Sequence, residues 1–296
     1  EVEAANKGTV RVSIVDPTKK PEEAERLGLA PQQMQIVEQS EQRVALVYTG
    51  IVVEYLDRPE VIPAILSIET LEYELVKAIR AAAGGKRLVA GLLVGDQDKS
   101  LENDYRTLQG ALAQAGYEPR AVERGQAIDD DVDVLYVLGN AAMDRYDAAF
   151  VDAYVMKGGK VFFAVKGVNV SPEYGLAAMA IPESGILPVL ERYGFTIAPE
   201  LLLDQSSLTV PFQTQGPTGG MNIQYMRYPH WVAIDGRYVS PDSQLTARFA
   251  GLDLFWPSPL SLRPVQGVTY KELAQTTTNA WLQKKTLAAG PDDQAL

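Results

Sequence analysis

The chain contains no cysteine and a single histidine, His230. Without thiols it can form no disulfide, no thiolate nucleophile and no thiolate metal ligand. One histidine also excludes the clusters of imidazole ligands that hold zinc, copper or iron within one chain. These two absences remove several large classes of enzyme and metal protein before any motif is considered.

Long apolar runs are also absent. The longest apolar segments span about seven or eight residues, whereas a membrane-crossing helix needs roughly 20. Residues 1–8 lack the basic start and the apolar stretch of a signal peptide, and the sequence does not begin with methionine. We therefore expect the chain to be a soluble piece of a larger protein whose membrane anchors lie outside it.

Positive charge is scarce. The 27 Lys and Arg residues are outnumbered by 38 Asp and Glu residues, which gives a net charge of −11 with neutral histidine. Such a surface repels nucleic-acid phosphates and anionic lipid headgroups, so we expect binding to neither. The apolar fraction of 46% is nevertheless high enough for a sizeable buried core.

Apolar strands alternate with amphipathic helices in the middle of the chain. Strands are predicted at 87–94, 118–123, 133–138 and 160–165, and helices at 102–115, 144–157 and 182–193. This alternation predicts an α/β fold whose mostly parallel sheet is flanked by helices.

Two further regions surround this core of residues 84–198. Residues 1–83 predict a partial, truncated small α/β layer, with a strand at 10–15, a helix at 21–28, a hairpin over 35–55 and a linking helix at 68–83. Residues 199–296 are rich in Pro, Gly, Ser, Thr and aromatic residues. They predict a loop-rich extension that packs on the core and ends in a flexible tail.

Polar residues follow several of the predicted core strands. In open α/β sheets, ligands bind at the carboxyl ends of the strands, near a switch in strand order. The candidate ligand-binding residues at that edge are Asp96, Gln97, Glu102, Asn103, Asn140 and Asn169. The alternative interpretation is that the loop containing Asp96 to Asn103 only caps the next helix.

Three segments partly match the sequence motifs of functional sites, but each lacks a feature that its motif requires. The acidic run from Asp129 to Asp133 lacks the glycine and distal glutamate of a calcium-binding loop. The segment Gly158-Gly159-Lys160 follows a helix and precedes a strand, the reverse of a phosphate-binding loop. No Gly-x-Ser-x-Gly segment accompanies His230, which we interpret as a packing or loop residue. We therefore predict no metal, no cofactor and no catalytic residue.

Two alternatives stay open at this point. A hydrolase acting through Asp96 and Glu102 needs a cleft in which one of two paired carboxyl groups has a raised pKa. Aromatic residues in the extension predict a sugar or peptide groove, a partner surface, or simply the core of a loop-rich subdomain. Those aromatic residues are Tyr225, Tyr228, Trp231, Tyr238, Phe249, Phe255 and Trp256.

Several segments, taken in order, resemble a known family. They are Val12-Ser-Ile-Val-Asp-Pro17, Tyr48-Thr-Gly-Ile-Val-Val-Glu-Tyr55, Leu71-Glu-Tyr-Glu-Leu-Val-Lys-Ala-Ile79, Val132 to Leu138, Tyr154-Val-Met-Lys-Gly-Gly-Lys-Val-Phe-Phe163, Tyr193-Gly-Phe195, Leu203-Asp204 and Tyr228-Pro-His-Trp231. Together they resemble the GldG-like auxiliary component of ABC-type transport systems associated with gliding motility.

This resemblance implies a core of the flavodoxin or class I glutamine amidotransferase-like kind without its cysteine, and a non-enzymatic role. It also implies a location on the periplasmic face of the bacterial inner membrane. The expected partners are ABC permease or ATPase subunits or other envelope proteins, and membrane anchoring is expected from segments outside this chain. The alternative function is a small-ligand domain that binds a sugar or peptide at the carboxyl edge of the sheet.

Overall fold

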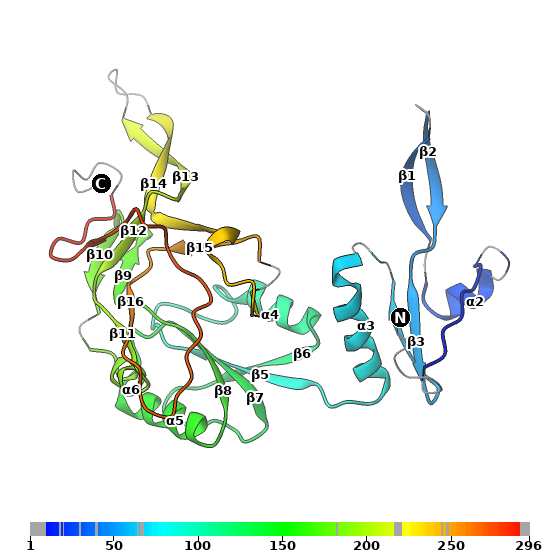
Figure 1. Ribbon diagram of the computed structural model, residues 1–296, viewed down its shortest axis with the longest axis horizontal. Helices are drawn as coiled ribbons and strands as arrows, with labels where there is room; N and C mark the ends of the chain where they lie inside the picture. Colours follow the sequence, from blue (N-terminus) through cyan, green and yellow to red (C-terminus); the bar gives the residue numbers. More distant parts are fainter. Residues whose placement is uncertain are drawn as a thin grey trace. The chain divides into compact units, whose positions relative to one another are not determined.

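A computed structural model describes residues 10–17, 19, 21–29, 31–38, 41–63, 65, 68–181, 183–215, 221–243, 245–246 and 249–290. The chain forms two compact units (Figure 1). The first contains Glu1–Arg87 with Gln114–Gly116, and the second contains Leu88–Ala113 with Tyr117–Leu296. The sequence-predicted core and extension therefore fall largely within the same unit.

The first unit is built from short helices and two-stranded sheets. Helix α2 (Pro21–Arg26) precedes the antiparallel pair β1 (Gln32–Glu38) and β2 (Glu41–Val47). A second antiparallel pair joins β3 (Ile51–Tyr55) to β4 (Arg58–Ile62), and α3 (Ile68–Ala82) follows. The predicted helices and the presence of a hairpin are confirmed.

Two details of the first unit differ from the prediction. Residues 10–15 form no strand, so that prediction is wrong: Ile14 is 99% exposed and no strand in the described part of the chain pairs with this segment. The second strand of the hairpin predicted over 35–55 also ends early, at Val47, and a second hairpin follows. Its turn residues Leu56 and Asp57 have φ of 49° and 62°, as a tight two-residue turn requires.

The second unit contains a four-stranded parallel sheet, as the sequence predicts. Its strands are β5 (Leu88–Val94), β6 (Tyr117–Val122), β7 (Val132–Leu138) and β8 (Lys160–Ala164). They lie in the order β6-β5-β7-β8. Because the chain passes from β6 back across β5 to β7, the strand order switches between β5 and β7.

Helices cover both faces of this sheet. On one face, Leu135 and Val137 pack with Val151 of α5 (Arg145–Met156) and Ile186 of α6 (Ile186–Arg192). On the other face, a smaller apolar cluster joins the sheet to α4 (Arg106–Gln114). Burial on both faces explains why the central strands β5 and β7 are nearly continuous apolar runs.

The start of α5 has a clear local cause. The Asp144 carboxylate accepts hydrogen bonds from the backbone N–H groups of Tyr146 and Asp147, while the Asp147 carboxylate accepts one from the Asp144 N–H. This reciprocal capping satisfies N–H groups that have no partner within the helix. These bonds lower the pKa of Asp144. The predicted start at residue 144 is therefore confirmed to within one residue.

Much of the rest of the second unit consists of short antiparallel pairs, which include residues both before and after residue 199. They are β9 (Val168–Ser171) with β10 (Ala177–Ala180), β11 (Phe195–Ile197) with β16 (Leu260–Leu262), and β12 (Leu201–Asp204) with β17 (Ala280–Gln283). Single-turn helices η1 (Pro172–Tyr174) and η2 (Gly236–Tyr238) connect some of them. A larger sheet joins β13 (Ser207–Gln215), β14 (Met221–Asp235) and β15 (Gly251–Phe255).

Buried aromatic residues of β14 hold the end of the described chain. Tyr228 is 1% exposed and donates a 2.5 Å hydrogen bond from Oη to the carbonyl of Ala289. His230 is 0% exposed, and its Nε2 lies 2.8 Å from the carbonyl oxygen of Ala288. His230 is thus a packing and hydrogen-bonding residue. Residues 291–296, to which the predicted flexible tail extends, lie outside the described residues.

Candidate functional site

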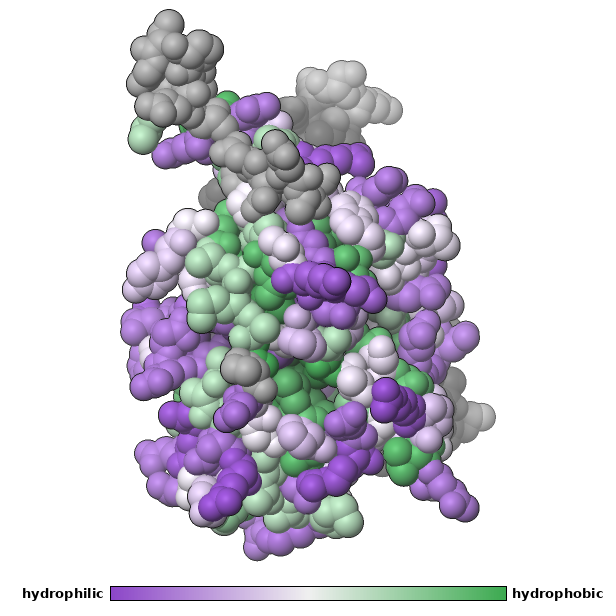
Figure 2. All heavy atoms as spheres, turned by 90° about the vertical axis from the view of Figure 1, so that its left-hand side faces the viewer, coloured by the Kyte–Doolittle hydropathy of each residue, from purple (hydrophilic) through white to green (hydrophobic). Residues whose placement is uncertain are grey.

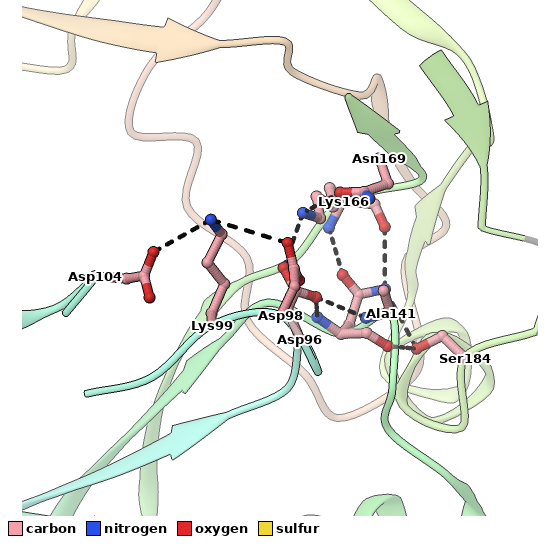
Figure 3. A network of polar contacts seen from close by, with 9 residues as sticks. Asp96, Asp98, Lys99, Asp104, Ala141, Lys166, Asn169 and Ser184 are labelled. Atoms are coloured by element: carbon pink, nitrogen blue, oxygen red, sulfur yellow. Dashed lines mark hydrogen bonds and ion pairs between the residues drawn. The ribbon is translucent and has the colours of Figure 1, made fainter. Parts of the chain in front are cut away.

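The switch in strand order brings together polar residues from three loops (Figure 3). Asp96 follows β5 and is only 7% exposed. Its Oδ1 accepts hydrogen bonds of 2.9 Å from the backbone N–H groups of Asn140 and Ala141, which follow β7. The prediction that the loops after β5 and β7 lie together at the carboxyl edge of the sheet is therefore confirmed.

A lysine completes this cluster. Nζ of Lys166, which follows β8, lies 2.8 Å from Oδ2 of Asp96 and donates a 2.8 Å hydrogen bond to Oδ1 of Asn169. Asp96 therefore has its charge balanced on one oxygen and two backbone donors on the other. Such partners offset the cost of burying a polar side chain.

Asn140 connects the cluster to a more distant loop. It is 0% exposed, and its amide accepts from the Lys166 N–H at 2.8 Å and donates to the Lys166 carbonyl at 3.0 Å. The same amide donates to Oγ of Ser184 at 3.2 Å, and that hydroxyl donates back to the Asn140 carbonyl at 2.8 Å. The polar groups thus satisfy one another.

Two glycines allow the loops to approach this closely. Gly139 has φ of +79°, and a Cβ added there would lie 2.4 Å from the carboxyl carbon of Asp96. A Cβ on Gly95 would lie 2.2 Å from the carbonyl oxygen of Gly139. Any larger residue at either position therefore separates the ends of β5 and β7.

The other candidates lie outside this cluster. Gln97, Glu102 and Asn103 are exposed, and Asn103 donates from Nδ2 to Oγ of Ser100 at 3.0 Å. Oδ2 of Asp104 accepts from the Ser100 N–H at 2.9 Å, so these residues form a turn that precedes α4. The structure thus joins Asp96, Asn140 and Asn169, but not the remaining three.

The chemistry open to the cluster is limited. Among the described contacts, none joins Glu102 to Asp96, so the paired carboxylates that a hydrolase of this kind needs are not brought together. The described residues also contain no group of three or more His, Asp or Glu that could hold a metal ion. In the acidic run, Asp131 pairs with Arg120 at 2.8 Å and Asp130 pairs with Lys157 at 2.8 Å.

Sequence reasoning missed two members of the cluster. Lys166 comes shortly after β8, so the same carboxyl-edge rule that selects Asn140 could have found it. Ser184 lies 44 residues from Asn140 in a loop, and no periodicity or motif marks it.

Tyr105 offers a test of this region at high pH. Burial, followed by the nearby charges of Asp96, Asp104 and Asp98, raises its pKa from 10.0 to about 12. Because the folded pKa is raised, the stability due to the neutral phenol is full below pH 10 and is lost as the pH rises through about 12.

We expect the variant Tyr105→Phe to lose less stability than the wild type between pH 10 and pH 12. Urea midpoints measured across this range would give the slope for each protein, and tyrosinate absorbance would follow the titration. Equal slopes for the two proteins would contradict the expected ionisation.

A second candidate site is the projecting hairpin of β13 and β14 (Figure 1). Beyond the part of β14 that pairs with β15, the ribbon is two-stranded. Met221, Ile223 and Tyr225 alternate along β14 and therefore share one face. They are 83%, 65% and 70% exposed. Tyr225 pairs with Pro211 across the ribbon, which adds to the apolar surface.

Exposed apolar residues are not confined to the hairpin. Figure 2 shows a band of hydrophobic residues down the middle of one face of the molecule, bordered by hydrophilic ones. Among the short strands, Met179 of β10 and Leu260 of β16 are 68% and 64% exposed. Those two residues also lie in two-stranded sheets, and the hairpin differs because three exposed apolar side chains share one face of a single strand.

The aromatic residues of the extension divide between the core and the surface. Tyr228, Trp231 and Trp256 pack together, with ring centroids of Trp231 and Trp256 5.6 Å apart. Nε1 of Trp256 donates to Oη of Tyr228 at 2.9 Å. These three thus fill a core, whereas Tyr225 is exposed on the hairpin.

Most of the chain matches the sequence model of a known protein family. The sequence model of an ABC transport auxiliary family, described as an ABC-type uncharacterized transport system, matches residues 87–295. The chain belongs to this family. The matched residues include both the carboxyl-edge cluster and the hairpin. Membership in the ABC transport auxiliary family confirms the auxiliary transport component that the resemblance implied.

A relative matches most of the chain. The chain is 24% identical over 291 residues to a protein of Borreliella burgdorferi that is described only as an uncharacterized protein. The match covers 95% of this chain and 55% of that relative, so the chain spans about half of the relative's length. No solved structure matches the chain.

Proposed function

We propose that this chain is a non-enzymatic, extracytoplasmic domain of an ABC transporter auxiliary subunit, of the GldG-like kind, and that it acts by contacting a protein partner. The observation that carries the proposal is the exposed apolar face of the β13–β14 hairpin within a chain of the ABC transport auxiliary family. The proposed partner is a permease or ATPase subunit, or another envelope protein, of the same transport system.

The energetics of the hairpin support a partner. A two-stranded ribbon is only marginally stable in water, and large apolar side chains on it gain nothing until they are covered. Burying one such side chain contributes roughly 1.5–3 kcal/mol. A partner that covers Met221, Ile223 and Tyr225 therefore gains free energy that offsets part of the cost of association.

The proposed location rests on the resemblance and on composition. The family resemblance implies a periplasmic domain, and the acidic, cysteine-free sequence is compatible with that compartment. Within the part of the chain that the structure describes, no helix is long and apolar enough to cross a bilayer. We propose that membrane anchoring comes from segments outside this chain.

The structure weighs less in favour of the small-ligand alternative. At the carboxyl edge of the sheet, Asp96 and Asn140 have their polar groups occupied by neighbouring loops. A ligand there would have to displace these contacts. The cluster is therefore better suited to fixing the loops than to capturing a sugar or peptide.

A pull-down from native membranes tests the proposal. The chain serves as bait, and the comparison variant carries Met221→Ser, Ile223→Ser and Tyr225→Ser. We expect the variant to recover about tenfold less of its ABC transporter partner, because a loss of about 1.4 kcal/mol corresponds to a factor of ten. Mass spectrometry of the recovered proteins gives the ratio.

A control on the opposite face of the same strand makes the test specific. Gln224 is exposed and lies between Ile223 and Tyr225, so its side chain points to the other side of the ribbon. The variant Gln224→Ser should recover as much partner as the wild type. If the triple variant, with unchanged thermal stability, recovered as much partner as the wild type, the proposed contact would be wrong.

A further inference from the structure

A polar hollow of about 330 Å³ lies where the hairpin leaves the body of the second unit. It is formed by the turn after β12, the starts of β13 and η2, one residue of β14 and the turn before β17. The lining residues are Gln205, Ser206, Ser207, Arg227, Arg237, Tyr238, Thr277 and Asn279.

A buried carboxylate holds the walls of this hollow in place. Asp204 is 0% exposed, and its Oδ1 accepts from the Ser206 N–H at 2.9 Å and from Oγ1 of Thr277 at 2.6 Å. Its Oδ2 accepts from the Thr277 N–H at 2.7 Å. Oγ of Ser206 donates to the Ala233 carbonyl at 2.7 Å. These hydrogen bonds thus fix the turns that line the hollow.

The charged residues that line the hollow are both arginines. Nη1 of Arg227 donates to the Gln205 carbonyl at 3.4 Å, a long contact that leaves most of the guanidinium donors free. Nε of Arg237 pairs with Oδ1 of Asp235 at 3.0 Å, and its side chain is 80% exposed. The carboxylates nearby are Asp204, which is occupied by three donors, and Asp235, and neither lines the hollow.

The Ser207 hydroxyl lies beside the hollow but not on its surface. Its Oγ is closed to solvent and has no hydrogen-bond partner among the described residues. A group that solvent cannot reach cannot contact a ligand in the hollow, whereas the two arginines and the Asn279 amide are among the groups that can.

We propose that this hollow binds a small oxyanion, namely the carboxylate or phosphate group of a small polar molecule. Guanidinium groups present paired donors that match the oxygens of carboxylates and phosphates. The Asn279 amide supplies a further donor. Such a pair of arginines stands out on a chain with a net charge of −11.

The bound group would also connect β14 to the turn before β17. Arg227 lies on β14 opposite Thr209, and Asn279 follows Thr277 in that turn. A ligand held by both residues therefore links the root of the ribbon to the turn that contains Thr277. This site does not depend on which partner the exposed face of the hairpin contacts.

Isothermal titration calorimetry of the full chain tests the site. The probes are inorganic phosphate and citrate, each titrated at constant ionic strength set with sodium chloride. We expect Arg227→Gln to weaken binding of the probe by about tenfold or more, which corresponds to the loss of one charge-assisted hydrogen-bonding group. Binding of citrate alone would assign a carboxylate ligand, and binding of phosphate alone would assign a phosphate ligand.

Two further variants make the result decisive. Arg263→Gln removes the same charge from a residue that is 77% exposed and does not line the hollow, and it should bind the probe as the wild type does. Ser207→Ala should bind the probe as the wild type does and keep the melting temperature, because its hydroxyl is closed to solvent and has no partner to lose. Equal weakening by Arg227→Gln and Arg263→Gln, or no binding of either probe to the wild type at about 10 mM, would overturn the proposal.

Discussion

The variant Asp96→Ala is expected to lower the free energy of unfolding of the second unit by about 3–5 kcal/mol, the usual cost of removing one partner of a buried ion pair. The substitution leaves two backbone N–H groups, those of Asn140 and Ala141, without their acceptor. It also leaves the Lys166 ammonium without its counter-charge in a partly buried position. Three neighbouring groups thus lose their partner at once.

Urea denaturation followed by tryptophan fluorescence measures this change. All three tryptophans, Trp231, Trp256 and Trp281, lie in the second unit, so the signal reports that unit alone. Asp98→Ala is the matched control, because Asp98 is 71% exposed and pairs with Lys99 at 3.9 Å. Its effect should stay within about 0.5 kcal/mol.

A double variant separates the causes of the loss. Replacing Lys166 by methionine together with Asp96→Ala removes the unpaired ammonium, so part of the lost stability should return. If Asp96→Ala alone cost less than about 1 kcal/mol, the cluster would not be structural, and weight would move to ligand capture at that edge.

The second large effect is expected from Asp204→Ala. This change removes the acceptor for the Ser206 N–H and for both the N–H and the hydroxyl of Thr277. Each buried donor left without a partner costs about 1–3 kcal/mol, and water entering the space left by the side chain offsets part of this cost. We expect a net loss of about 3 kcal/mol, measured by the same fluorescence signal.

Two comparisons test the origin of that loss. Asp204→Asn keeps one acceptor oxygen and the shape of the side chain, so it should cost clearly less than Asp204→Ala. Asp253→Ala, at an exposed position on β15, should leave stability unchanged within about 0.5 kcal/mol. A cost for Asp253→Ala as large as that for Asp204→Ala would point to a general charge effect instead.

The parallel sheet could be predicted because its two central strands, β5 and β7, are largely buried. Each of these two is a short, mostly apolar run followed by a glycine, and the alternation with helices indicates the parallel arrangement. The start of α5 was equally readable, because Asp144 and Asp147 form a recognisable capping pair. Local chemistry and tertiary packing agree at these places.

The failures have equally physical causes. Residues 10–15 have the composition of a strand, but a strand also needs a neighbour, and sequence does not show whether one exists. The turn at Leu56 and Asp57 lacks the glycine or asparagine that usually marks a two-residue hairpin. The helix predicted from residue 102 starts at Arg106, because Ser100 and Asp104 bind one another in a turn instead.

The candidate site was predictable only in part. The rule for carboxyl ends of strands selects Asp96, Asn140 and Asn169, and the structure brings them together. Sequence could not show that these groups satisfy one another, because that depends on Lys166 and Ser184 arriving from other loops. The strand β14 was not predicted within the loop-rich extension, and the sequence could not show which side of the ribbon would remain uncovered.

The attachment of the chain near Gly290 to β14 has a mechanical consequence. Ala288 and Ala289 are hydrogen-bonded to His230 and Tyr228, and these two residues lie on the same strand as Ile223 and Tyr225. A force applied to the chain at Gly290 would therefore load these two contacts and, through them, β14. The strand thus has one part bonded to the end of the described chain and another part exposed in the hairpin.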